Sequence, residues 1–305
     1  MTSYVLRRML VAIPTIFIII ALSFLLMYSA PGGPFDSDAM LEPEILRNLE
    51  RAYNLDKPVY QQFLIYVGNV LSGDLGPSII YKDYTVTELL ATGLPVSISL
   101  GLKAIVIAFT LGTFFGIVAA LNQNSAFDYS VMSLAMTGVA VPNFVWAPVM
   151  TLFFGIYLSL LPVAGWGGLR HQVLPVFALA LPQVAMIARL MRGSMIEVLR
   201  SNYIRTARAK GMRERRVVTR HALRAAILPL VSYLGPHIAG VVTGSVIIEQ
   251  IFNLPGIGRY FIQGALNRDY PLVLGIVIVY SSAVIVLNLI VDIIYGWLDP
   301  KVKYA

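Results

Sequence analysis

The sequence predicts an all-α polytopic membrane protein with six transmembrane helices and a small helical extracytoplasmic cap after the first of them. Three observations support this prediction. Of the 305 residues, 57% are hydrophobic and only 13% are charged, whereas soluble domains usually carry about 25% charged residues. Six apolar runs are long enough to cross a bilayer. Lys and Arg are concentrated in the segments that six spans would place on the same side.

The composition excludes several classes of function. The chain has no cysteine, which excludes a disulfide framework, a thiolate metal site and thiol catalysis. Its three histidines (His171, His221 and His237) do not have metal-ligand spacing. The sequence contains no GxxxxGK[ST], HExxH or GxSxG motif and no pair of membrane aspartates suited to a protease. We therefore expect no catalytic residue, no metal and no cofactor in this chain.

The first span follows a short basic start that contains Arg7 and Arg8. The apolar run from Met9 to Ala30 is longer than the roughly 7–15 apolar residues of a secretory signal. The positions before Ser29 and Ala30 also lack the small-residue pattern of a cleavage site. We interpret residues 1–30 as a cytoplasmic N-terminus and a retained first transmembrane helix.

Residues 31–94 have a different composition and form the predicted extracytoplasmic cap, with more acidic than basic residues and no run long enough to span. The segment from Pro43 to Tyr53 is predicted to form one helix. Pro58 is suited to the first position of a second helix that ends before Gly73. The stretch from Thr85 to Glu88 fits a capping box and predicts a third short helix.

The predicted membrane core covers residues 95–298, and residues 299–305 form a cytoplasmic tail. Its spans run approximately over 95–121, 129–158, 173–191, 226–252 and 271–298. Pro142 and Pro148 break the span over 129–158. Such breaks fit packing around a cavity, because neighbouring helices or water satisfy the freed backbone groups, and they fit a plain structural kink equally well.

The distribution of positive charge sets the orientation. Six spans place 15 of the 23 Lys and Arg residues on the inside and seven on the outside, with Lys103 not assigned to either side. Loops rich in Lys and Arg stay in the cytoplasm. We therefore expect both termini to be cytoplasmic. This placement also accounts for the net charge of +7 without nucleic acid.

The predicted cytoplasmic loop over residues 192–225 is the most basic part of the chain. Eleven of the 23 Lys and Arg residues lie between Arg189 and Arg224. Within it, Ser201 or Asn202 can cap a short helix that Gly211 ends. A helix with mixed apolar and basic positions can dock in a groove of a soluble partner. Contact with anionic lipid explains the same charge equally well from the residues alone.

A second helix is predicted beyond Gly211, because arginines recur there at three- or four-residue spacing. These arginines are Arg213, Arg216, Arg220 and Arg224.

Polar and charged residues inside the predicted spans are functional candidates by default. Lys103 lies near the outer end of its span, where it can snorkel. Glu249 and Asp292 fit structural roles better than a proton relay. The candidates for a translocation path are Thr137, Asn143, Gln183, Ser232, His237, Thr243 and Ser245. Hydrogen bonding between helices accounts for these path candidates equally well.

The loop has a recognisable pattern. The order RTARAKG over residues 205–211, RHALR over residues 220–224 and Leu-Pro at residues 228–229 resembles the cytoplasmic "EAA" loop of bacterial ABC importer permeases. Arg205 and Thr206 replace the Glu and the first Ala of the general motif, and the gap to Leu-Pro is longer, as in the peptide and nickel branch. Other stretches in the same order (NLDKPVYQQF, SGDLG, VPNF, IEQIFNLPGIG, ALNRDYPLV and VDIIYGWLDP) extend the resemblance over the whole chain, and it is strongest to the B-subunit permease of oligopeptide importers.

This resemblance implies a type I ABC importer permease fold in a bacterial inner membrane. It implies a heterodimer with a related permease, two cytoplasmic ATPases that bind ATP and Mg²⁺, and an extracytoplasmic peptide-binding protein. The ATPase-coupling residues would be Asn202, Tyr203, Ile204, Arg205, Thr206, Ala207, Arg208, Ala209, Lys210, Gly211, Arg213 and Arg216. Substrate would cross by alternating access.

Alternatives remain open at this point. Within the branch, the substrate could be dipeptides, cell-wall peptides, haem or nickel chelates instead of oligopeptides. From a different class, an ion-coupled secondary carrier would work as a single chain and would depend on Glu249 or Asp292. A third hypothesis is a membrane scaffold that recruits a cytoplasmic factor.

Overall fold

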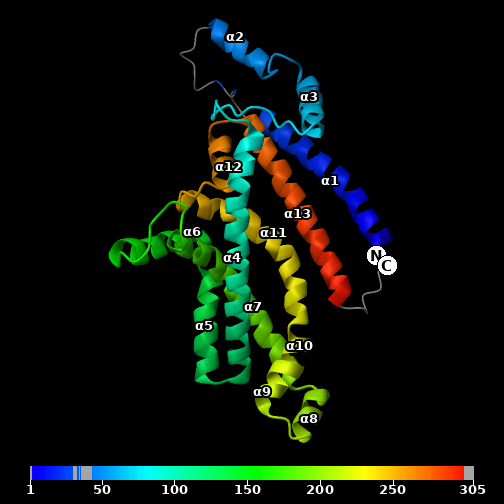
Figure 1. Cartoon of the computed structure of the whole chain (residues 1–305), viewed down its shortest axis with the longest axis vertical. Helices are drawn as coiled ribbons and strands as arrows, with labels where there is room; N and C mark the ends of the chain where they lie inside the picture. Colours follow the sequence, from blue (N-terminus) through cyan, green and yellow to red (C-terminus); the bar gives the residue numbers. More distant parts are fainter. Residues whose placement is uncertain (1, 30–32, 34, 36–42, 299–305) are drawn as a thin grey trace. The chain divides into compact units, whose positions relative to one another are not determined.

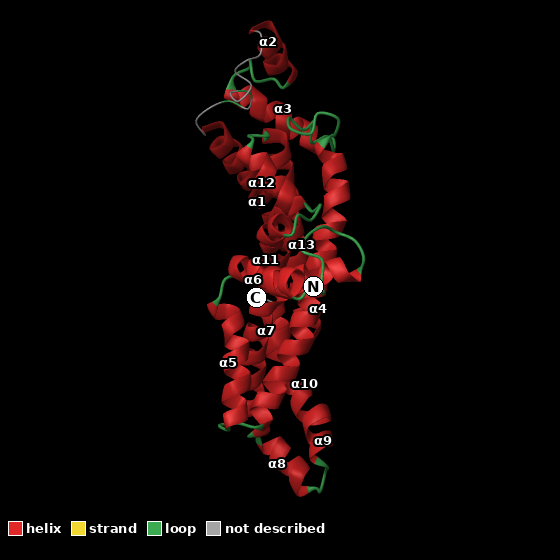
Figure 2. Ribbon diagram, turned by 90° about the vertical axis from the view of Figure 1, so that its left-hand side faces the viewer, coloured by secondary structure: helices red, strands yellow, loops and turns green. Residues whose placement is uncertain are grey.

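The computed structural model describes residues 2–29, 33, 35 and 43–298. Side chains are described in these ranges outside 2–9, 43, 234–236, 238–240, 242–244 and 291–298. The described chain is helical and contains no strand (Figure 2), which confirms the predicted all-α class. The chain divides into two compact units, Met1–Val96 with Pro255–Val286 and Ser97–Leu254 with Leu287–Ala305.

The first unit contains the first span, the cap and the beginning of the last helix (Figure 1). Its helices are α1 (Thr2–Ser29), α2 (Pro43–Ala52), α3 (Val59–Leu71), the start of α4 (Val86–Leu121), α12 (Ile257–Leu266) and the first part of α13 (Tyr270–Leu298). Its core is an apolar cluster of buried residues: Val86, Leu89, Leu90, Ile257, Leu272 and Ile276. Two of the predicted cap helices are confirmed as α2 and α3, within one residue of their expected ends.

The capping box is present, but the expectation that it opens a short helix was wrong. The Thr85 backbone N–H donates to Glu88 Oε2 at 2.8 Å, and the Glu88 N–H donates to Thr85 Oγ1 at 3.2 Å. The helix that follows is α4, which runs for 36 residues with Pro95 inside it. Burial of the apolar residues at the start of α4 favours helix on both sides of this proline, so the predicted boundary at residue 95 is not an element boundary.

A buried carboxylate fastens the cap to the loop before α13. Asp269 is fully buried and accepts hydrogen bonds from the Ser78 hydroxyl and from the N–H groups of Ile79 (2.9 Å) and Ile80 (3.1 Å). Its other oxygen accepts from the Leu272 N–H at 3.1 Å, the usual geometry of an N-cap aspartate. One side chain therefore both caps α13 and holds the loop that precedes α4.

The second unit contains most of α4 and the middle of the chain. Its other helices are α5 (Ala126–Ala140), α6 (Asn143–Met150), the π-helix η2 (Thr151–Tyr157), α7 (Leu169–Leu199), α8 (Asn202–Ala209), α9 (Glu214–Arg216), the π-helix η3 (Val217–Ala222), α10 (Leu223–Ala226) and α11 (Leu228–Ile251). The long helix α7 packs against α5, α6 and α11 and contributes most of the buried core of this unit.

The predicted break at Pro142 is confirmed. Between α5 and the α6–η2 pair the chain bends by 105°. Val141 and Pro142 have extended backbone angles, and Val141 does so because a residue that precedes proline is disfavoured in the helical region. Pro148, in contrast, lies inside α6 and does not end it.

Among the described residues, four helices are long and apolar enough to cross a membrane, in α1, α4, α7 and α13, and the bent pair α5 with α6–η2 would make a fifth. The helix α11 is 24 residues long, but several of its side chains lie outside the described residues. The count of six spans therefore stays a prediction, as do the cytoplasmic positions of residues 299–305 and of the N-terminus.

Helices extend into both ends of the predicted basic loop, and its bounds at the membrane stay a prediction. The span expected over 173–191 is part of α7, which continues to Leu199, so the first residues of the predicted loop are helical. At the other end, α10 and α11 begin at Leu223 and Leu228. The connection outside the long helices is therefore shorter than 192–225 and starts near Arg200.

Glycines allow the helices of this unit to pack closely. A Cβ at Gly112 would lie 2.7 Å from Ile187 Cβ, and one at Gly116 would lie 2.6 Å from the Ala188 carbonyl oxygen. Gly112 and Gly116 are four residues apart on one face of α4, the small-xxx-small spacing by which membrane helices approach each other. The axes of α4 and α7 can come this close only without side chains at both positions.

Gly116→Ala is therefore expected to lower the free energy of unfolding by about 1–3 kcal/mol, the usual cost of overpacking. The matched control is Gly193→Ala on α7, where a Cβ would meet no atom within 4 Å. That change should be neutral or stabilising by up to about 1 kcal/mol, because Ala favours helix over Gly. Thermal unfolding of the purified protein in detergent measures both, and equal midpoints for the two variants would contradict the packing.

Candidate functional site

The basic segment forms a short helix, α8, that projects beyond the ends of α5 and α7 (Figure 1). Ser201 occupies its N-cap position with extended backbone angles, although its hydroxyl donates to the Val198 carbonyl oxygen at 2.6 Å and does not cap the helix. Gly211 follows the helix with φ +75°, the left-handed conformation that ends many helices. The helix bounds, Asn202–Ala209, lie inside the predicted Ser201–Gly211.

The two faces of α8 differ in exposure. Ile204 is fully buried and Ala207 is 5% exposed, because this face packs on the chain's own η3. The other predicted coupling residues of the helix are exposed: Asn202, Tyr203, Arg205, Thr206, Arg208 and Ala209. Tyr203, at 48% exposure, is the large hydrophobic side chain on this face. The structure therefore separates the predicted set into an inner face that holds α8 in place and an outer face that a partner can reach.

The segment after α8 is tied back to it by an ion pair. Arg208 donates to Glu214 through two nitrogens, at 2.6 and 3.1 Å. These hydrogen bonds hold the pKa of the Glu214 carboxyl below its usual range. Because both side chains are substantially exposed, the pair contributes little to stability. The ion pair instead positions the chain, because it holds the beginning of α9 beside the end of α8.

The predicted second basic helix is present, but it is not a regular one. Residues 214–226 form α9, the π-helix η3 and α10 in succession. All four predicted arginines of this stretch (Arg213, Arg216, Arg220 and Arg224) are exposed, as are the coupling candidates Lys210 and Gly211. The apolar residues Val217, Val218 and Ala222 are buried and provide the surface on which α8 rests.

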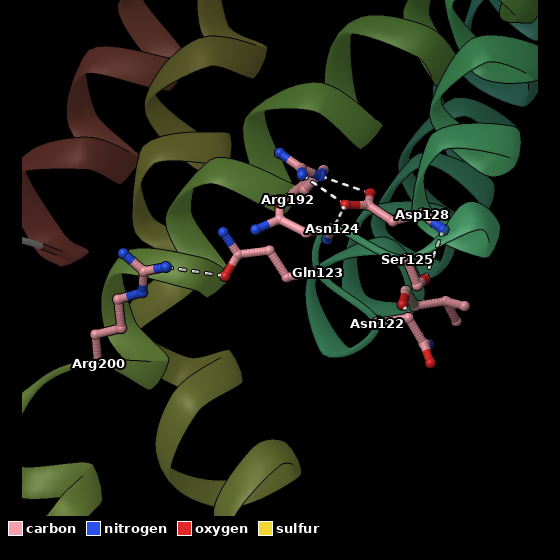
Figure 3. Close-up of polar contacts among 8 residues, drawn as sticks. Asn122, Gln123, Asn124, Ser125, Asp128, Arg192 and Arg200 are labelled. Atoms are coloured by element: carbon pink, nitrogen blue, oxygen red, sulfur yellow. Dashed lines mark hydrogen bonds and ion pairs between the residues drawn. The ribbon is translucent and has the colours of Figure 1, made fainter.

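At the base of this segment, an ion pair joins the first turn of α5, directly after the turn that links α4 to α5, to α7 (Figure 3). Arg192 Nε and Nη2 donate to the two carboxylate oxygens of Asp128 at 2.7 and 2.6 Å. Asp128 is only 1% exposed and also accepts the Asn124 N–H at 2.9 Å, while Ser125 caps α5 by accepting the Asp128 N–H. The two-pronged geometry fixes the relative orientation of the turn and α7.

A second contact lies directly after the end of α7. Arg200 donates to Gln123 Oε1 at 3.1 Å (Figure 3). Arg192 and Arg200 are eight residues apart, about 12 Å along a helix. The turn is therefore held at two levels, directly before the chain enters α8. Sequence reasoning did not single out Asp128 or Arg192, and the one available signal was a carboxylate and an arginine at the ends of predicted spans.

The predicted path residues have different environments. The Thr137 hydroxyl donates to Leu134 O at 2.6 Å and the Ser232 hydroxyl to Leu228 O at 3.2 Å, each within its own helix. The His237 ring stacks on Tyr233 with centroids 3.7 Å apart. Gln183 is partly buried on α7, and the Thr243 side chain lies outside the described residues. Their assignment to a path stays a prediction.

Buried polar atoms on α6 and α11, two helices that pack together, point to a polar region. Asn143 Oδ1, Trp146 Nε1 and Gln250 Oε1 are buried without a hydrogen-bond partner among the described residues. Buried polar atoms normally bond to protein or ordered water, so these three atoms are candidates for hydrogen bonds to water or to a ligand. Asn143 was a predicted path residue, whereas Trp146 and Gln250 were not singled out.

The charged residues expected inside the membrane also have distinct settings. Glu249 is fully buried on α11 and accepts a hydrogen bond from the Ser245 hydroxyl at 2.7 Å. Lys103 donates to Ser99 and Gln172. The side chain of Asp292 lies outside the described residues. In the described part of the chain, no group of three or more His, Asp or Glu residues could hold a metal ion.

Comparison with known families gives full-length matches. Residues 112–304 match the model of the binding-protein-dependent transport system inner membrane component, and residues 1–101 match the N-terminal model of such membrane components. The chain is 51% identical over 306 residues, covering all of both chains, to the oligopeptide transport system permease proteins OppB of Haemophilus influenzae and Escherichia coli K12. It is 42% identical over 303 residues to the dipeptide transport system permease protein DppB of Bacillus subtilis, covering 99% of this chain and 98% of DppB.

Solved structures with a similar fold include an inward-facing conformation of the MetNI methionine ABC transporter. The match has a TM-score of 0.61 at 15% identity and covers 70% of this chain and 97% of that chain. At this identity the similarity concerns the fold alone.

Proposed function

Since this chain belongs to the family of binding-protein-dependent transport system inner membrane components, we propose that it forms the transmembrane pathway of an ATP-driven oligopeptide importer. The observation that carries the proposal is the 51% identity to OppB permeases over the full length of both chains. The dipeptide permease at 42% identity makes dipeptides the second candidate substrate. Membership of this family places the chain in the inner membrane.

Membership of this family also implies partner proteins. We propose a heterodimer with a second, related permease, two cytoplasmic ATPase subunits that bind ATP and Mg²⁺, and an extracytoplasmic binding protein that delivers the peptide. This chain then performs no catalysis itself. It contributes the outer face of α8 to energy coupling. Both chain termini lie on the cytoplasmic side, the same side as α8.

The geometry supports a mechanism of alternating access. An ATPase that moves α8 also moves η3, on which Ile204 and Ala207 pack. The movement reaches α7 directly, since only Arg200 and Ser201 separate the two helices. Through Asp128 and Arg192 it then reaches the turn between α4 and α5. Movement at one short helix is thereby passed to three long ones, which is what opening and closing a pathway requires.

Tyr203→Ala is expected to weaken ATPase binding by at least roughly ten-fold, equal to about 1.4 kcal/mol, because exposed aromatic side chains are the usual anchors of interfaces. Because the side chain is exposed, the fold should tolerate the change. Co-purification of the ATPases in detergent and ATP-dependent uptake of a labelled peptide in proteoliposomes measure the effect.

The matched control is Thr219→Ala, an exposed residue of η3 outside the predicted contact zone. Bulky substitutions of Ala207 are a poor test, since Ala207 is buried against the chain itself. Unchanged ATPase binding and uptake in Tyr203→Ala would refute docking through this face. Uptake by this chain alone, driven by a proton gradient without ATP, would instead establish an ion-coupled carrier.

A further inference from the structure

Lys103 is a cation in a membrane helix, and no carboxylate in the described part of the chain forms an ion pair with it. Its ammonium group donates to Ser99 Oγ at 2.7 Å and to Gln172 Oε1 at 2.5 Å, and both acceptors are neutral. The Trp166 ring lies 5.5 Å from the nitrogen, within the range of a cation–π contact. Among the described side chains, no carboxylate pairs with Lys103.

The surroundings of Lys103 bring together three segments of the second unit. Ser99 lies one turn earlier on α4, Gln172 lies in the first turn of α7, and Trp166 belongs to the loop before α7. The Gln172 amide donates to the Gly167 carbonyl at 2.9 Å, and the Gly165 N–H donates to the Phe252 carbonyl at 2.8 Å. The loop is thus fastened both to α7 and to the end of α11, so the position of the ammonium group is fixed before any ligand arrives.

The sequence around this site is positive. From residue 129 to residue 196 the chain has no Asp or Glu, and Arg170 and His171 precede Gln172. An ammonium group has three N–H donors, and the hydrogen bonds to Ser99 and Gln172 leave one of them. Lys103 is partly exposed and lies on the predicted outer side of its span. A charge that is costly to place in a membrane, held rigidly and partnered only by neutral groups, has the properties of an anion-binding group.

We propose that Lys103 binds the terminal carboxylate of the peptide as it enters the transmembrane pathway. This inference rests on the proposed function, because it takes a peptide as the substrate. Peptides of different sequence share only their backbone and their two ends. A single fixed ammonium group can therefore engage every member of the substrate class through the carboxylate, with no preference for side chains.

The test uses the assembled complex in proteoliposomes and one peptide in two forms, with a free and with an amidated C-terminus. The affinity of the binding protein for each form is measured separately, and both are supplied at saturation. The wild-type complex is expected to import the free acid about ten-fold faster, the effect of one charge-assisted hydrogen bond worth about 1.4 kcal/mol. Lys103→Gln should remove this preference by slowing the acid only, and Lys103→Arg should retain it.

Two further variants sharpen the test. Lys82→Gln, an exposed lysine of the cap, should behave as wild type. Gln172→Glu keeps an acceptor for Lys103 and adds a competing carboxylate, so it should also remove the preference, which keeps the proposal testable if Lys103→Gln fails to assemble.

Three results would overturn the inference. Equal slowing of both peptide forms would mean that Lys103 only bridges α4 and α7. If Lys103→Gln slows both peptide forms equally and the slowing varies with the anionic-lipid content of the vesicles, the ligand is a headgroup phosphate. A preference that survives in Lys103→Gln and Gln172→Glu would place carboxylate recognition elsewhere. If the wild-type complex imports neither form, the proposed function itself fails.

Discussion

Replacing Arg192 with Met is expected to lower the free energy of unfolding by about 3–5 kcal/mol, the usual cost of removing one partner of a buried ion pair. The loss is large because Asp128 is only 1% exposed and would keep its charge without a counter-ion. Thermal unfolding in detergent measures it. In proteoliposomes, peptide uptake should fall more steeply than ATP hydrolysis, because the turn between α4 and α5 no longer follows α7.

The two residues of this pair allow a sharper comparison. Asp128→Asn should cost less than Arg192→Met, since the arginine left behind is 26% exposed and can reach water. The double variant should be more stable than the sum of the single effects predicts, because neither charge is left alone. Arg189→Met, an exposed position one turn earlier on α7, is the matched control and should be neutral. Additive effects of the two single changes would contradict a direct pair.

Asp269→Ala is expected to destabilise the first unit by about 3 kcal/mol or more. The substitution removes a buried carboxylate that accepts from Ser78, Ile79, Ile80 and Leu272, and hydrogen bonds to a charged group contribute about 1.5–3 kcal/mol each. The loop over residues 78–80 then loses its attachment to the start of α13. Faster cleavage in this loop by an added protease should accompany a lower unfolding temperature.

Asp83→Ala provides the control for this prediction, because Asp83 is an exposed acid of the cap in the same unit. It changes the net charge of the first unit by the same amount without removing a buried acceptor, so its unfolding temperature and cleavage rate should match wild type. Asp269→Asn should lie between Asp269→Ala and wild type, since its amide keeps one oxygen acceptor but presents an NH₂ group to N–H donors. Equal behaviour of the Asp83 and Asp269 variants would show that the carboxylate does not hold the loop.

The sequence by itself determined the features that depend on composition and on neighbouring residues. The low charged fraction and long apolar runs give the helical membrane class. Pro43 and Pro58 mark α2 and α3, and the extended backbone required before Pro142 gives the bend. The C-terminal end of α8 follows from Gly211, which takes the left-handed conformation. Each of these signals acts within a few residues, so it can be read without knowing the fold.

Only the tertiary structure decided the features that join distant parts of the chain. Asp128 and Arg192 are 64 residues apart, and Ser78 and Asp269 are 191 residues apart. No local pattern indicates which carboxylate meets which donor. The continuation of α4 through Pro95 depends on packing against α12 and α13, which local helix signals do not contain. The same holds for α8, where burial of Ile204 and Ala207 on η3 decides which face is left for a partner.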